Sequence, residues 1–133
     1  ALQTYRAGFR PSKALAAPYA MAAINVFAAE TDAEALRLST SMQQAFAAVV
    51  TGMPGKVKPP VDDITTVLDA RQLAAVQSRL TYAAIGGRET VRDKLTAFAG
   101  QTGVDEVMIT GMVFDLDDRI RSLEITAEAI AEL

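Results

Sequence analysis

The order of structural elements is decided by residues 19–42, which read YAMAAINVFAAETDAEALRLSTSM. The first part, Tyr19–Ala29, is short and nearly all apolar, and a helix signal follows it at once, which is typical of a fully buried parallel strand. A buried helix is the competing interpretation, because alanine is frequent in this stretch. Thr31 and Glu34 then fit the S/T-x-x-E capping box, in which Thr31 caps the helix and Glu34 reaches back. The apolar face of that helix, which runs to about Thr51, consists of Leu38, Met42, Ala45, Phe46 and Val49.

Working outward, residues 1–9 indicate the end of a helix that stops before Pro11, and residues 10–18 form a connection. Residues 52–68 form a Pro/Gly-rich excursion that is long for a connection inside a domain, and such loops are usually functional or mobile. The remaining predicted elements are a helix at 69–80, a short strand at 82–85, a helix after Gly87, a strand at 106–114 and a last helix capped by Asp115.

Strands that alternate with helices predict a parallel α/β arrangement, and the length predicts a single domain over residues 1–133. The last helix carries an apolar stripe that we expect to pack into the core. The stripe consists of Leu116, Ile120, Leu123, Ala127 and Ile130.

Composition excludes several classes of function. The chain has neither cysteine nor histidine, so disulfides, thiolate metal sites and Ser-His-Asp or Cys-His catalysis within it are impossible. The net charge of −3 and the scattered basic residues argue against nucleic-acid binding. No apolar run is long enough to span a membrane and no signal peptide is evident, which predicts a cytoplasmic protein. The chain starts at Ala1, so we expect either a processed start or a piece of a longer protein.

The turn Gly86-Gly87-Arg88 is the strongest local candidate for a ligand site. It follows a short strand and opens a helix, where backbone N–H groups and the helix N-terminus favour an anion. Arg88 could add a direct phosphate contact. The alternative is a plain strand-to-helix turn, because two adjacent glycines are a weak signal.

Asn25 and Thr110 are the two candidates within the strands. Asn25 is the only polar residue of its strand and shares a face with Met21, Ala23 and Phe27. It could point towards a ligand in a barrel, or it could satisfy a buried backbone group. Thr110 lies near the carboxyl end of its strand, where functional groups of barrels concentrate, although threonine is also a good strand former. The adjacent aspartates at 62–63 and 117–118 lack the spacing of an acid/base dyad, and a metal site is not expected.

Taken together, five segments resemble the C-terminal region of the bacterial luciferase-like, flavin-dependent monooxygenases. They are residues 5–12 (YRAGFRPS), 24–35 (INVFAAETDAEA), 59–63 (PPVDD), 86–91 (GGRETV) and 103–110 (GVDEVMIT). The resemblance covers nearly the whole chain, and its specificity comes from the order and spacing of the segments. The sequence departs from the family's usual Gly-Ser/Thr-Pro-Glu turn, because Gly87 stands where the hydroxyl residue sits and Arg88 where proline sits.

The resemblance implies a TIM-type (β/α)8 barrel that uses reduced FMN, or F420 in some relatives, on a small organic substrate with oxygen. It implies that the chain is the C-terminal part of the barrel, about three βα units, and that residues 52–68 belong to the variable segment near the active site. It places the missing N-terminal part, with most flavin contacts and the usual catalytic histidine, outside the chain. It suggests Gly86, Gly87, Arg88, Asn25 and Thr110 as cofactor-binding residues, with no catalytic residue in the chain itself.

Two expectations follow from these interpretations. A stand-alone, non-catalytic α/β interaction or ligand-binding module is the alternative function, since fold analogy alone never fixes function. In the barrel interpretation an open sheet would expose Tyr19, Met21, Ala23 and Phe27 on one strand and Met108 and Met112 on another. The folded chain is then predicted to be a homo-oligomer or to bind the missing part of the barrel.

Overall fold

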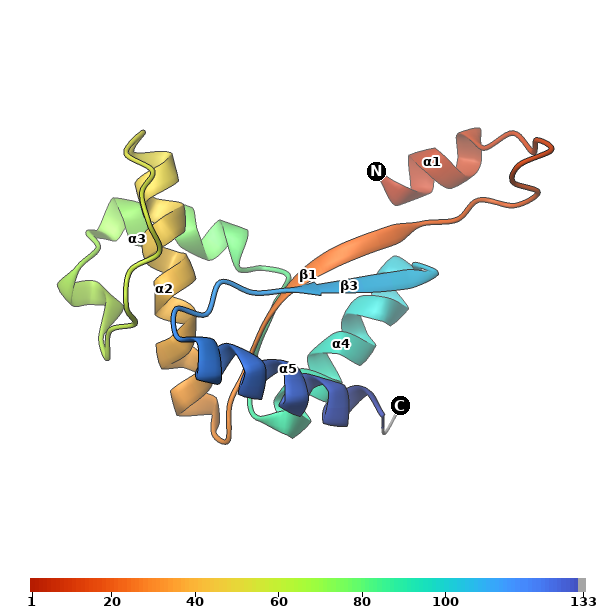
Figure 1. Ribbon diagram of the computed structural model, residues 1–133. Helices are drawn as coiled ribbons and strands as arrows, with labels where there is room; N and C mark the ends of the chain where they lie inside the picture. The colour runs from red at the N-terminus through yellow and green to blue at the C-terminus, as the bar shows by residue number, and fades with distance from the viewer. Residues whose placement is uncertain (132–133) are drawn as a thin grey trace.

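The computed structural model describes residues 1–131, in which three strands form one parallel sheet flanked by helices (Figure 1). The elements, in chain order, are α1 (Leu2–Gly8), β1 (Met21–Ala28), α2 (Asp32–Val50), the 3-10 helix η1 (Ile64–Thr66), α3 (Ala70–Arg79), β2 (Ala83–Gly86), α4 (Arg88–Thr102), β3 (Glu106–Thr110) and α5 (Leu116–Ile130). The predicted parallel α/β arrangement is confirmed, and residues 21–28 form a strand rather than a buried helix.

The sheet has the strand order β2-β1-β3, with β1 in the centre. Asn25 of β1 is opposite Ala83 of β2 on one side and opposite Thr110 of β3 on the other. Three successive βα units of a barrel would place their strands in the order β1-β2-β3, whereas here β1 lies between β2 and β3. The four residues of β2 pair only with the carboxyl half of β1, whereas β1 and β3 pair along five residues. The longer strand pairing in the sheet is therefore the one between β1 and β3.

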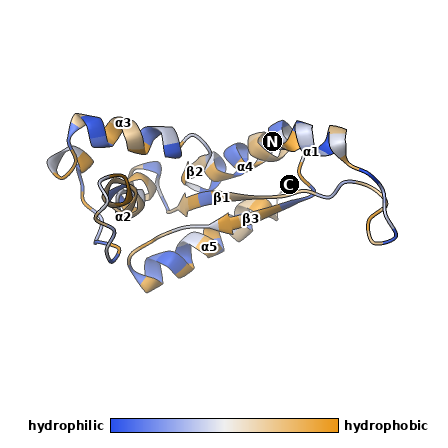
Figure 2. Ribbon diagram, turned by 90° about the horizontal axis from the view of Figure 1, so that it is seen from above, coloured by the Kyte–Doolittle hydropathy of each residue, from blue (hydrophilic) through white to orange (hydrophobic). Residues whose placement is uncertain are grey.

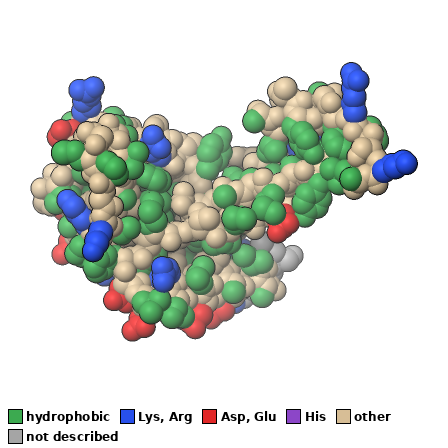
Figure 3. All heavy atoms as spheres, turned by 45° about the horizontal axis from the view of Figure 1, so that its top comes forward, with side chains coloured by type: hydrophobic (Ala, Val, Ile, Leu, Met, Phe, Trp, Pro, Cys, Tyr) green, Lys and Arg blue, Asp and Glu red, His purple; other side chains and the backbone are tan. Residues whose placement is uncertain are grey.

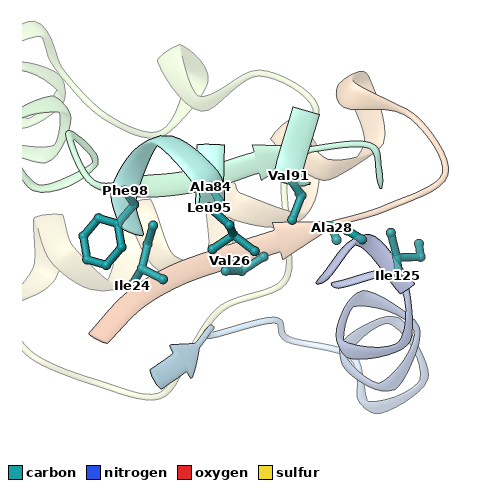
Figure 4. Close-up of a cluster of buried hydrophobic side chains, with 9 residues drawn as sticks. Ile24, Val26, Ala28, Ala84, Val91, Leu95, Phe98 and Ile125 are labelled. Atoms are coloured by element: carbon teal, nitrogen blue, oxygen red, sulfur yellow. The ribbon is translucent and has the colours of Figure 1, made fainter. Parts of the chain in front are cut away.

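One face of the sheet is covered by α4 and α5. Ile24, Val26 and Ala28 of β1 point into this core, where they meet Val91, Leu95 and Phe98 of α4 and Ile125 of α5 (Figure 4). The buried hydroxyl of Ser122 on α5 accepts a hydrogen bond from the amide of Ala28 at 2.9 Å. This contact satisfies a backbone donor at the end of β1 that would otherwise be buried without a partner.

The opposite face is covered only at its carboxyl end. Phe27 is fully buried there against α2, in a cluster with Leu38, Met42 and Val113. The prediction that Phe27 faces water is wrong, because α2 packs over it, and Met112 is partly buried against the same cluster.

The excursion at 52–68 is fastened to α2. The Thr40 hydroxyl accepts a hydrogen bond from the amide of Val61 at 2.9 Å, and the Gln44 side chain donates to the carbonyl of Pro59 at 2.9 Å. Two polar side chains that lie on the buried side of α2 therefore hold the middle of this Pro-rich segment.

Two local predictions about the helices are wrong in part. Thr31 does cap α2, because its hydroxyl accepts from the amide of Glu34, but the Glu34 carboxylate does not reach back: it accepts two hydrogen bonds from Arg37 at 2.7 and 2.9 Å. The stripe of α5 does not pack into the core. The buried face of α5 is instead formed by Ser122, Ile125, Thr126 and Ala129.

Candidate functional site

An uncovered sheet face is the main candidate for a functional surface. It is formed by alternate residues of β1 and β3 that the parallel register places side by side: Met21 next to Glu106, Ala23 next to Met108, and Asn25 next to Thr110. Met21 and Met108 are 47% and 50% exposed, and Tyr19, which precedes β1, is 51% exposed. Figure 3 shows this side of the molecule, hollowed between the part around α2 and the N-terminal arm, with hydrophobic side chains at its surface.

Asn25 and Thr110 form a polar pair on this face. The Thr110 hydroxyl donates to the Asn25 side-chain oxygen at 3.1 Å. Within residues 1–131 no hydrogen bond is recorded from the Asn25 side-chain NH2 group, and the side chain is half-buried. Since a side-chain amide carries two N–H donors, the pair offers hydrogen-bond donors to a ligand on the open face. The sequence predicted both residues, and the structure brings them together.

The Gly86-Gly87-Arg88 turn begins at the last residue of β2, where Gly86 is opposite Ala28, the last residue of β1. Gly86 has a φ of +155°, and a Cβ there would come within 2.4 Å of the Thr90 side chain. Glycine is therefore required at this turn, because the backbone adopts a conformation that L side chains rarely take and the space is filled. Arg88 begins α4 and its side chain is exposed.

The N-terminus of α4 is occupied by a carboxylate from α2. Asp32 accepts a hydrogen bond from the amide of Gly87 at 2.6 Å and one from the Thr90 hydroxyl at 3.2 Å. Gly87 itself provides no side-chain cap, and Asp32 places a negative charge at the start of α4, where the helix dipole favours it. These contacts lower the pKa of Asp32, with the Gly87 amide as the largest cause.

The two groups of predicted residues do not share one pocket. Gly86 lies three residues further along the sheet than Asn25, about 10 Å away at the rise of a strand. Phe27, buried under α2, is on the same face of β1 as Asn25 and closes the sheet towards that end. The structure therefore pairs Asn25 with Thr110 and places the glycine turn separately.

Sequence reasoning missed two features of this site. One is Asp32, whose role depends on an approach of α2 to the start of α4 across 55 residues of sequence. The other is Tyr19, whose hydroxyl donates to Glu106 at 2.9 Å at the other end of the open face, a contact that raises the pKa of Tyr19. No sequence motif marks either contact.

The open face differs in its polar groups from one end to the other, with Tyr19 and Glu106 at the amino end and Asn25 and Thr110 near the carboxyl end. Its polar groups near the carboxyl end are an amide and a hydroxyl, which donate and accept hydrogen bonds but do not exchange protons near neutral pH. The described residues hold no cluster of three or more acidic, histidine or cysteine side chains that could bind a metal ion. Within residues 1–131 no helix is long and apolar enough to cross a membrane.

The fold defines a parallel α/β chain whose sheet is open on one face. Comparison with known proteins shows which of them this chain is similar to. No family model matches the chain. The protein YvbT of Bacillus subtilis is 40% identical over 128 residues, which are 96% of this chain and 38% of YvbT. A luciferase-like monooxygenase of Escherichia coli K12 is 36% identical over 133 residues, which are 100% of this chain and 40% of that protein.

A solved structure is likewise matched over only part of its length. The crystal structure of apo-MsnO8 superposes with a TM-score of 0.73 at 27% identity, over 98% of this chain and 40% of that one. The chain thus resembles these proteins along its whole length but spans only about 40% of theirs.

Proposed function

We propose that this chain is the C-terminal part of a luciferase-like flavin-dependent monooxygenase, and that it forms one wall of the ligand pocket without carrying catalysis by itself. One observation carries the proposal: all 133 residues match a luciferase-like monooxygenase, yet they span only 40% of it. The part of that relative that this chain does not span is long enough to supply the remaining strands and helices of a barrel.

The arrangement of the sheet supports this proposal. Parallel sheets are covered on both faces in nearly all proteins, because their strands are apolar on both sides. Here α4 and α5 cover one face, while Met21, Ala23 and Met108 stay exposed on the other. In a closed barrel that second face would be the interior, and β1 and β3, which pair directly, would be neighbouring barrel strands. The short β2 would lie at the rim.

Asn25 and Thr110 are the residues that we propose to contact the ligand. The NH2 donors of Asn25, whose oxygen is held by Thr110, and the acceptor lone pairs of the Thr110 hydroxyl fit the hydrogen-bonding edge of a planar ring such as the isoalloxazine of FMN or the related ring of F420, or a polar group of a small organic substrate. Reduced flavin supplies the oxygen chemistry, and the residues of this chain bind, orient and exclude water.

The Gly86-Gly87-Arg88 turn is proposed as part of the pocket rim. Because the Gly87 amide already donates to Asp32, a phosphate at this turn would contact the Arg88 guanidinium rather than that amide. Asp32 then serves to hold the rim in place.

The test is a flavin titration of the longer protein that contains these residues, with FMN and F420 in the oxidised and reduced states. We expect one of them to bind, and the chain by itself to bind neither. Binding of neither cofactor in either state refutes the proposal. A cooperatively folded monomer of the chain alone, with no longer protein encoded, would instead support a stand-alone module.

Two variants test the assigned residues in the same titration. Asn25→Ala and Thr110→Val each remove one partner of the polar pair, and we expect about tenfold weaker binding of cofactor or substrate for a lost hydrogen bond in a closed pocket. Thr96→Val is the matched control, because Thr96 is an exposed threonine of α4 on the other side of the sheet. Equal affinities for Thr110→Val and Thr96→Val would remove Thr110 from the site.

A further inference from the structure

A cavity of about 390 Å3 lies between α2, the excursion and the start of α3. Its floor is formed by small side chains of α2, namely Ala45, Ala47 and Ala48, which leave space that larger side chains would fill. Met53 of the excursion and Val67, which precedes α3, add apolar walls and are exposed. Cavities of about 300–1,000 Å3 are of the size that holds a small molecule.

The cavity and the open sheet face lie on different sides of α2. Leu38 and Met42 of this helix pack in one cluster with Phe27 of the sheet. The residues of α2 that line the cavity are Gln44, Ala45, Ala47, Ala48 and Thr51. At about 100° per residue, the centre of this group lies roughly 130° around the helix from Leu38 and Met42. In Figure 2, which looks nearly along α2, the strands lie to the right of this helix and α3 lies above it, so the cavity is separate from the open face.

The cavity carries positive charge. Lys56 and Lys58 of the excursion line it and are exposed, and within residues 1–131 neither ammonium group has a recorded hydrogen bond or ion pair. From residue 35 to residue 61 the chain contains three basic residues and no aspartate or glutamate, although its net charge is −3. The carboxylate of Asp69, at the start of α3, is engaged by the amide of Gln72 at 2.8 Å. The two lysines are therefore available to an anion from outside the chain.

Gln44 adds a buried hydrogen-bond donor to the same cavity. Its side chain lies between α2 and the excursion and is only 9% exposed. The NH2 group donates one hydrogen bond to the carbonyl of Pro59 at 2.9 Å, and a side-chain amide carries a second N–H donor. No acceptor for that second donor is recorded among the described residues. Because buried donors are nearly always paired in proteins, a bound acceptor would complete this site.

We propose that this cavity binds a small organic anion with an apolar body. The alanine floor accommodates the apolar body, while Lys56 and Lys58 pair with its carboxylate, sulfonate or phosphate group and Gln44 donates a hydrogen bond to it. A neutral apolar molecule would leave the charge of the lysines unused, and an inorganic anion would leave the floor uncovered. The inference goes beyond the proposed function, because it holds whether or not a flavin binds at the open sheet face.

Backbone amide NMR of the chain during titration with 2-naphthoate tests the site. The neutral 2-naphthamide is the matched probe, because it has nearly the same shape without the charge. We expect 2-naphthoate to shift the signals of residues 44–58 and 67–72 and to bind about three- to fivefold more tightly than 2-naphthamide, as exposed ion pairs contribute modestly. Shifts confined to residues 21–25 and 106–110 would assign the binding to the open sheet face and overturn the proposal. Equal affinities of the two probes, or no shift with either, also overturn it.

A variant of the floor tests the apolar part of the site. Ala48→Leu places a larger side chain in the cavity, and we expect it to weaken 2-naphthoate binding about tenfold. Ala74→Leu is the matched control, because Ala74 is an exposed alanine of α3 outside the cavity lining. Thermal melting confirms that both variants fold. Equal affinities of the two folded variants would show that the floor does not hold the ligand, which overturns the proposal.

A variant of the lysines tests the charged part and decides the outcome even if Ala48→Leu does not fold. Lys56→Gln combined with Lys58→Gln should lower the affinity for 2-naphthoate to that for 2-naphthamide and leave the binding of 2-naphthamide unchanged. Lys13→Gln, in the exposed connection before β1, is the matched control and should change neither affinity. An unchanged affinity for 2-naphthoate in the double variant overturns the proposal. These titrations contain no flavin, so their outcome is independent of the flavin titration.

Discussion

The two halves of β1 have similar sequences but different surroundings. The carboxyl half, from Val26 to Ala28, is buried on both faces, because α4 and α5 cover one and α2 covers the other. The amino half is covered on one face only, and Met21 and Ala23 of its other face are exposed. Both halves consist of apolar residues suited to a covered sheet. The open half therefore has the apolar sequence of a strand that is covered on both faces, but within the described residues nothing covers its second face. This is what a part of a larger fold would show.

The largest expected effect sets the two halves against each other in stability. Phe27→Ala removes a fully buried ring between the sheet and α2, and we expect a loss of about 3–5 kcal/mol in the free energy of unfolding. Met21→Ala, on the open half, should change it by less than about 0.5 kcal/mol. Urea denaturation of both variants measures the difference. Equal losses would mean that the open face is covered in solution, either by another part of the chain or by a second copy of it.

A second prediction concerns the closed end of the sheet. Gly86→Ala forces a side chain into a backbone with φ of +155° and against Thr90, and we expect a loss of about 1–3 kcal/mol. Gly100→Ala is the matched control, because Gly100 is inside α4 and a Cβ at that position would have no neighbouring atom within 4 Å. This change should stabilise the chain by about 0.4–1 kcal/mol. If thermal melting ranks the two variants in the opposite order, the tight turn at Gly86 is not formed in solution.

The sequence predicted the helices and strands better than it predicted which of them would pack together. Sequence patterns predicted the three strands and the five α-helices but not the 3-10 helix Ile64–Thr66, and they gave Asn25 and Thr110 as two separate candidates within the strands. They could not reveal that α2 would cover Phe27 but not Met21, because both residues have the same alternation and apolar character. Nor could they show that the α5 stripe would stay exposed, since apolar residues on a helix do not by themselves reveal which side faces the sheet. The Asp32 contact with Gly87 depends on packing between distant segments, which no local pattern contains.

The third prediction concerns association at the open half. Two exposed methionines on adjacent strands, Met21 and Met108, form the centre of an apolar surface that favours self-association. We expect the chain alone to sediment as an oligomer at micromolar concentration. Met108→Lys should shift it towards the monomer while leaving its melting transition nearly unchanged, because the side chain is already half exposed. Lys13→Met, in the exposed connection before β1, serves as a control for general changes in charge and hydrophobicity.

A monomer that melts cooperatively without any substitution would contradict the open-sheet interpretation. The same experiment in the longer protein sharpens it: Met108→Lys should then be strongly destabilising, because the face would be enclosed and a buried ammonium group is costly.

The smallest effect is expected in the pH dependence of the closed end. The amide of Gly87 and the hydroxyl of Thr90 hold the pKa of Asp32 below its ordinary value of 3.8. A carboxyl whose pKa is lowered by folding binds protons more weakly in the native state, so its contribution to stability is present above the ordinary pKa and is lost as the pH falls through the lowered one. Asp32→Asn removes this titration but keeps the shape of the side chain.

We therefore expect the difference in unfolding free energy between the native chain and Asp32→Asn to be constant near neutral pH and to shrink as the pH falls below 3.8. Denaturant titrations at a series of pH values measure it, with Asp62→Asn, an exposed aspartate of the excursion, as the control. A difference that stays constant down to the acid limit would show that Asp32 does not bind the Gly87 amide and the Thr90 hydroxyl in solution. Because Asp32 is exposed to solvent, loss of this contact should lower the overall stability only a little. Its main effect should be local, namely a less ordered Gly86-Gly87-Arg88 turn. Faster amide exchange at Gly87 in Asp32→Asn, with unchanged exchange in β1, would locate the effect at that turn and separate it from the packing that encloses Phe27.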